Sequence, residues 1–122
     1  MVRGSVSQQF GRIATERGRA NEKRALDACV LPARPAWMQS VRMASREEDR
    51  DGIDLVIDSD VGKLYVQVKS SRGGKMAFLQ RRRRARVAVV VVSATDSPEA
   101  IQRRIVGEVG KIRAEFIKQR GS

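Results

Sequence analysis

The stretch GIDLVIDSDVGKLYVQVKSS, residues 52–71, constrains the fold of this chain more than any other. Residues 53–58 and 63–70 both have the period-2 character of β-strands, and SDVG between them predicts a tight turn. Successive side chains of a strand point to opposite faces, so one face of the second strand carries Tyr65, Gln67 and Lys69. We therefore expect a β-hairpin in which Asp54 approaches this polar face at the end away from the turn.

The other patterns place helices and strands around this hairpin. They predict, in chain order, a helix over 8–30, a strand over 37–44, a polar loop over 45–52, a short basic helix over 75–84, a central strand over 86–93 and a helix from Pro98 to about residue 118. A chain of 122 residues is long enough for one core. The order α-β-β-β-α-β-α therefore predicts a single α/β domain, residues 1–122, whose mixed central sheet has helices on both faces.

Composition limits the classes of function. The chain has 25 Lys and Arg against 14 Asp and Glu, a formal net charge of +11, which favours a polyanionic partner. Nucleic acid is the first expectation and an anionic membrane surface the second; excess charge without a partner is the alternative. There is no histidine and one cysteine, Cys29, which excludes a Cys/His zinc site, a histidine base and an internal disulfide. We expect Cys29 to be a small core residue.

The longest apolar run, VAVVVV over 87–92, is far too short to span a bilayer. We therefore expect no membrane-spanning segment and a cytoplasmic protein.

Acidic and basic residues are separated along the chain. Residues 44–60 hold seven acids, whereas residues 61–95 hold none and carry nine basic residues. This pattern suits a metal site beside a surface that contacts phosphates. The candidate nucleic-acid contacts are Ser70, Ser71, Arg72, Lys75, Arg81, Arg82, Arg83 and Arg84. The alternative is a strand end followed by a solvated helix face.

The hairpin also offers ligands for a metal ion. Hard divalent cations such as Mg²⁺ prefer oxygen ligands, and Asp54 supplies a carboxylate, Gln67 an amide oxygen and Val68 a main-chain carbonyl. Lys69 could orient a water molecule or neutralise charge in the transition state. The alternatives are that Asp54 bonds the preceding loop and that Gln67 and Lys69 form a solvated strand face.

The motifs GID, with Asp54, and QVKSS, from Gln67 to Ser71, in this order of elements resemble the PD-(D/E)xK nuclease superfamily. The resemblance is greatest to small members with a Holliday-junction-resolvase-like or restriction-endonuclease-like core. It implies a helix glutamate at the metal, which GRANEKRAL supplies as Glu22, with Glu16 as a rival. The implied catalytic set is Glu22, Asp54, Gln67 and Lys69, with Mg²⁺ or Mn²⁺ held by Glu22, Asp54, Gln67 and Val68.

One departure is Gln67, where the family more often has Glu or Asp, and it removes one negative charge.

The resulting hypothesis is a Mg²⁺-dependent endonuclease that hydrolyses phosphodiester bonds in DNA, including branched DNA, and acts as a homodimer. RNA stays open as a substrate. The alternative is a non-catalytic nucleic-acid-binding module on a nuclease-like fold, because a fold alone does not establish activity. A third hypothesis is a basic protein that docks on an acidic protein partner or on RNA within an assembly.

Overall fold

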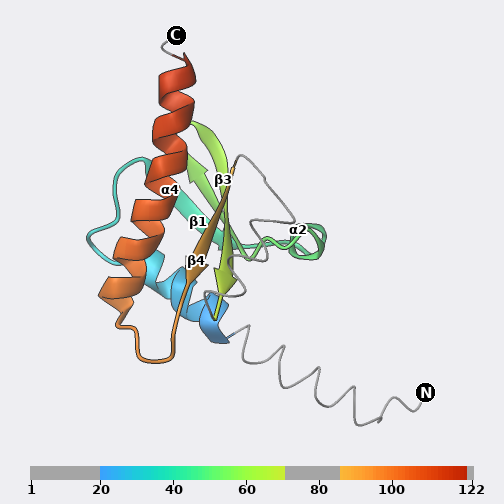
Figure 1. The fold of residues 1–122 in the computed structure, drawn as a ribbon, viewed down its shortest axis with the longest axis vertical. Coiled ribbons are helices and arrows are strands. Elements are labelled where there is room, and N and C mark those ends of the chain that lie inside the picture. The colour runs from blue at the N-terminus through green and yellow to red at the C-terminus, as the bar shows by residue number, and fades with distance from the viewer. Residues whose placement is uncertain (1–19, 71–85, 121–122) are drawn as a thin grey trace, which may run out of the picture.

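The computed structural model describes residues 20–70 and 86–120, which form a mixed four-stranded sheet with helices packed on it (Figure 1). The strands lie in the order β1-β2-β3-β4; β1, β2 and β3 are antiparallel neighbours and β4 runs parallel to β3. The strands are β1 (Met38–Met43), β2 (Leu55–Ser59), β3 (Gly62–Lys69) and β4 (Val87–Val91). The helical segments are residues 20–29, α2 (Arg46–Arg50) and α4 (Pro98–Arg120). The predicted mixed α/β architecture is confirmed.

The β2–β3 hairpin closes at the turn that the sequence predicts. Ser59 pairs with Gly62, and the Ser59 hydroxyl donates to the Gly62 carbonyl at 2.6 Å while accepting the Val61 N–H at 3.2 Å. Gly62 has a φ of 100°, a conformation that side chains other than hydrogen rarely allow. The turn fixes the register, and the register decides which side chains of β3 face Asp54.

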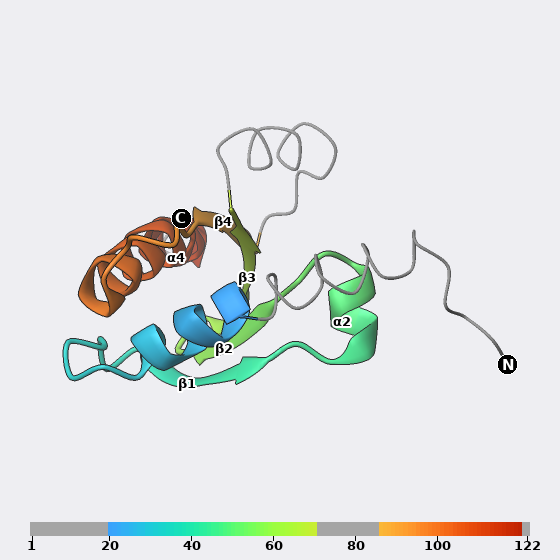
Figure 2. The same ribbon diagram turned by 90° about the horizontal axis from the view of Figure 1, so that it is seen from below.

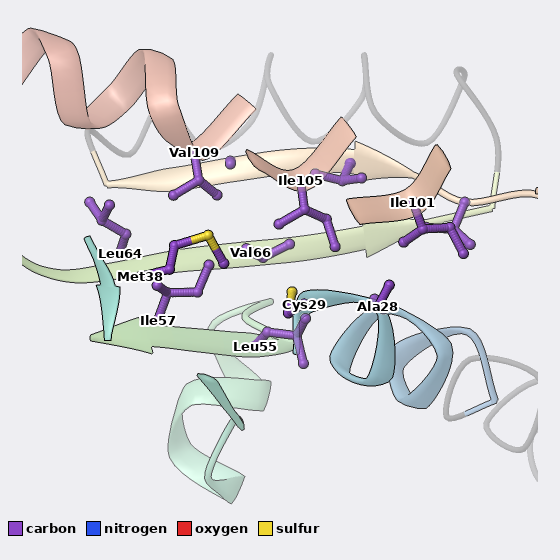
Figure 3. Close-up of a cluster of buried hydrophobic side chains, with 14 of the residues drawn as sticks. Ala28, Cys29, Met38, Leu55, Ile57, Leu64, Val66, Ile101, Ile105 and Val109 are labelled. Atoms are coloured by element: carbon purple, nitrogen blue, oxygen red, sulfur yellow. The ribbon is translucent and has the colours of Figure 1, made fainter. Parts of the chain in front are cut away.

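The main core lies on one face of the sheet. Helical residues 20–29 and α4 both pack on this face (Figure 2). Ile101, Ile105 and Val109 of α4 point toward β3 in Figure 3. Thus, in the part of the chain that the structure describes, the two longest helical segments cover the same face.

The opposite face carries a smaller apolar cluster of Ile53, Val56, Val87 and Val89, with Tyr65 against it. The two clusters together bury both faces of β4, as its apolar run predicts. The central position predicted for this strand is wrong among the described strands, because β4 lies at the edge of the sheet. Its edge position is compatible with burial because α4 packs along it.

Residues 45–52 differ from the predicted polar loop, because they contain the helix α2. Ser45 caps this helix: its hydroxyl accepts the Glu48 N–H at 3.2 Å, and the Glu48 carboxylate accepts the Ser45 N–H at 2.8 Å. This reciprocal pair is a capping box, and it stabilises a helix of only five residues with no buried side chain.

One further sequence prediction is confirmed, and two fall on residues that the structure does not describe. Cys29 is buried in the main core, as predicted, and burial raises the pKa of its thiol to about 12. The basic helix predicted over 75–84 and the first part of the helix predicted over 8–30 lie outside the described residues.

We expect Ile105→Ala to lower the free energy of unfolding by about 2–5 kcal/mol, because it leaves a cavity under α4. Ile105 is completely buried, whereas Ile117 on the same helix is 43% exposed and serves as the control. Urea denaturation followed by circular dichroism measures both variants. Equal losses in Ile105→Ala and Ile117→Ala would contradict the placement of α4.

Candidate metal centre

Asp54 lies immediately before β2, where this strand parts from β3. Its backbone N–H donates to the Val66 carbonyl at 2.8 Å, and its carboxylate accepts the Val68 N–H at 2.7 Å. Asp54 thus bonds to the main chain of β3 on both sides of Gln67. The residue is only 7% exposed. The predicted proximity of Asp54 to the polar end of β3 is confirmed.

Three carboxylates converge at this point. One oxygen each from Glu22, Asp49 and Asp54 lies within 4.8 Å of the other two. Glu22 comes from helical residues 20–29 and Asp49 from α2. The structure therefore brings Glu22 to Asp54, as the resemblance implies, and adds Asp49, an acid of the stretch 44–60 for which the resemblance implies no role.

Glu22 is positioned by the anchoring of its helix. The apolar residues Ala25, Ala28 and Cys29 of this helix are completely buried in the main core. Arg24 donates to the carbonyls of Ser93 at 3.0 Å and Asp96 at 2.7 Å, in the loop before α4. These contacts hold residues 20–29 over the end of the sheet where Asp54 lies.

Asp49 is positioned by a chain segment that closes on Asp54. The Ala44 N–H donates to the Asp54 carbonyl at 3.0 Å, and the Ile53 N–H donates to the Glu48 carbonyl at 3.0 Å. Arg42 of β1 donates two hydrogen bonds to the Glu48 carboxylate, at 2.9 and 3.2 Å. The two ends of the segment from residue 44 to residue 54 are therefore hydrogen-bonded to each other, and its helix α2 is hydrogen-bonded to β1.

Gln67 contributes a buried polar atom to this end of the sheet. The residue is 7% exposed, and within the described part of the chain its Oε1 accepts no hydrogen bond. Burial of an unpartnered polar group is costly and calls for an explanation. Gln67 shares a strand face with Lys69, whose charge acts on Asp54. A bound cation near Asp54 would satisfy this oxygen.

The remaining predicted residues fall into two groups. Lys69 ends β3 and is partly buried, and Ser70 follows it, exposed. Val68 touches the site through its N–H, so the metal-binding role of its carbonyl stays a prediction. The other candidate nucleic-acid contacts lie outside the described residues: Ser71, Arg72, Lys75, Arg81, Arg82, Arg83 and Arg84.

The electrostatics of the centre disfavour negative charge on Asp54. Burial raises the pKa of the Asp54 carboxyl, and the neighbouring Asp49 charge raises it further. The hydrogen bonds with Glu22 and with the Val68 N–H lower this pKa, as does the charge of Lys69, but burial has the largest effect. A positive charge in direct contact with the carboxylates would therefore stabilise the ionised form of Asp54.

The donor set fits a hard divalent cation. Glu22, Asp49 and Asp54 offer carboxylate oxygens and Gln67 an amide oxygen. The chain has no histidine, and its single cysteine is in the core, so the nitrogen and sulfur ligands typical of zinc do not occur here. Mg²⁺, Mn²⁺ and Ca²⁺ all accept such oxygen ligands.

Comparison with models of known protein families, with curated proteins and with solved structures finds no match to this chain. In residues 20–70 and 86–120, no helix combines the length and the apolar character needed to cross a membrane.

We expect Asp54→Asn to raise the melting temperature of the metal-free chain at neutral pH. A carboxyl whose pKa is raised by folding costs stability once it ionises, so stability falls as the pH rises from the ordinary pKa of 3.8 through the raised value. The asparagine keeps an acceptor for the Val68 N–H and removes the charge.

Thermal unfolding in EDTA, followed by circular dichroism across the acidic and neutral range, measures this difference. The advantage of Asp54→Asn should vanish below the ordinary pKa, where both chains are uncharged at this position. A variant that melts below the natural chain at neutral pH would contradict the electrostatic account.

Proposed function

We propose that this chain is a Mg²⁺- or Mn²⁺-dependent nuclease that hydrolyses phosphodiester bonds in DNA, with RNA as an alternative substrate. The observation that carries the proposal is the convergence of carboxylates on Asp54 beside the buried Gln67 oxygen, which has no hydrogen-bond partner among the described residues. Lys69 at the same end of β3 and the net charge of +11 supply the positive groups that a polyanionic substrate requires.

The finer fold assignment is part of the same proposal. A mixed sheet with Asp54 immediately before β2, and Gln67 and Lys69 on β3, is compatible with a restriction-endonuclease-like core of the PD-(D/E)xK type. Glu22, reaching the site from the first described helix, fits the same arrangement.

The proposal gives each side chain a role. Asp54 and Glu22 would hold the cation, and the Val68 N–H keeps the Asp54 carboxylate oriented toward it. Gln67 would add a neutral oxygen ligand. When bound, a divalent cation acidifies a water molecule and stabilises charge on a phosphoryl oxygen. Lys69 would hold a phosphate or offset negative charge as it develops.

A homodimer belongs to this proposal, because one centre of this kind cuts one strand and two copies would cut a duplex. The competing function is a non-catalytic nucleic-acid-binding module, and the neutral Gln67 favours it, since a site with fewer negative charges binds a cation less tightly. Both functions require nucleic-acid binding, and only the nuclease requires Asp54, Lys69 and a divalent ion.

We expect metal-dependent cleavage that disappears in Asp54→Ala and Lys69→Ala. The assay uses labelled duplex, single-stranded, flap and four-way-junction DNA, and single-stranded RNA, with Mg²⁺, Mn²⁺ or EDTA. Loss of a catalytic group should lower the rate by a factor of about 10² or more.

Two matched control variants distinguish the loss of a group in the metal centre from a change in the overall charge of the chain. Asp58 of β2 and Lys63 of β3 point to the same face of the sheet as Asp54 and Lys69, but they lie toward the turn. Asp58→Ala and Lys63→Ala should retain cleavage. If no substrate is cleaved, and salt-sensitive binding is unchanged in Asp54→Ala and Lys69→Ala, the nuclease proposal is wrong and the non-catalytic binding module is favoured.

A further inference from the structure

We propose that Asp49 is a third carboxylate ligand of the divalent cation and that it compensates for the neutral side chain of Gln67. This inference rests on the metal centre of the proposed function. It assigns a role to α2, a helix that lies between two strands and carries none of the residues expected at the site from the sequence.

The first support is position. The Asp49 carboxylate lies within 4.8 Å of both Glu22 and Asp54, although each of the three comes from a different segment. Asp49 is exposed on a helix without buried residues, so apolar packing does not explain why its side chain meets two other acids. Like charges at this distance repel each other, and the repulsion is relieved by a cation bound between them or by a shared proton, as in the hydrogen bond between Asp54 and Glu22.

The second support is the way in which α2 is held. The capping box between Ser45 and Glu48, and the two hydrogen bonds from Arg42 to Glu48, fix the helix against β1. The Gly52 N–H donates to the Asp49 carbonyl at 2.9 Å, which returns the chain toward Asp54. Glu48 is therefore a positioning residue, and the residue it positions is Asp49.

The third support is the charge of the centre. Glu22 and Asp54 bring two negative charges, and Lys69 offsets one of them. Asp49 adds another negative charge, so that these four side chains together carry the net negative charge that balances a divalent cation. Gln67 supplies the oxygen that a glutamate would supply, but without its charge, and this oxygen is buried and unpartnered among the described residues.

The test is a calorimetric titration of the whole chain with Mn²⁺, without any nucleic acid. The variants are Asp49→Asn, Asp54→Asn, the double variant Asp49→Asn/Gln67→Glu and the control Glu47→Gln. Glu47 is an exposed acid of the same helix, so its variant removes the same charge from α2 at another position. Thermal unfolding in EDTA verifies that each variant is folded.

We expect Asp49→Asn to weaken Mn²⁺ binding at least about tenfold, since even the loss of an outer partner of a metal ligand has an effect of this size. Glu47→Gln should bind as the natural chain does. Gln67→Glu should restore most of the affinity lost in Asp49→Asn, because it returns a negative charge to the same cation. A residue that only supported the structure of α2 would not be rescued from β3.

Other outcomes overturn the inference in distinguishable ways. If Asp49→Asn binds Mn²⁺ normally while Asp54→Asn does not, Asp49 is not a ligand, and the proposed metal centre stands without it. If Asp49→Asn is weakened but Gln67→Glu gives no recovery, the compensation is wrong. If the natural chain does not bind millimolar Mn²⁺, the metal-dependent function fails together with this inference.

Discussion

The carboxylate of Asp54, buried where β2 separates from β3, is the constraint on which the site depends. Its backbone carbonyl accepts the Ala44 N–H, its backbone N–H donates to Val66 and its side chain accepts the Val68 N–H. One residue therefore ties together the α2 segment and both strands of the hairpin. Displacement of Asp54 would break the hydrogen bonds that connect the α2 segment to the end of β3.

The site is costly to fold, and the core on the other side of the strands offsets that cost. Three carboxylates lie close together and a buried amide oxygen lacks a partner among the described residues, which are both destabilising arrangements. Val66 and Val90, on the strands beside them, are completely buried under the helices. Unfavourable polar groups held by a well-packed scaffold are typical of functional sites, where stability and activity conflict.

Local patterns were sufficient to predict the hairpin, the strand β4 and the helix α4, because the hairpin and α4 have an apolar periodicity and β4 is a continuous, mostly β-branched apolar run. The alternation along β3 also predicted that Gln67 and Lys69 would face Asp54. The five-residue helix α2 was missed, although Ser45 and Glu48 form a readable capping box. Its stability comes from hydrogen bonds at its first turn and from Arg42, and a search for apolar periodicity does not detect such contacts.

The sequence by itself determined which elements form and which side chains share a face, since both depend on neighbours along the chain. Only the tertiary structure decided that Glu22, Asp49 and Asp54 meet. Burial of Ala25 and Cys29, together with the bonds from Arg24 to the loop before α4, brings Glu22 to the end of the sheet. Hydrogen bonds between the two ends of the α2 segment bring Asp49 to the same end of the sheet. These contacts join residues far apart in sequence, and no local pattern encodes such distances.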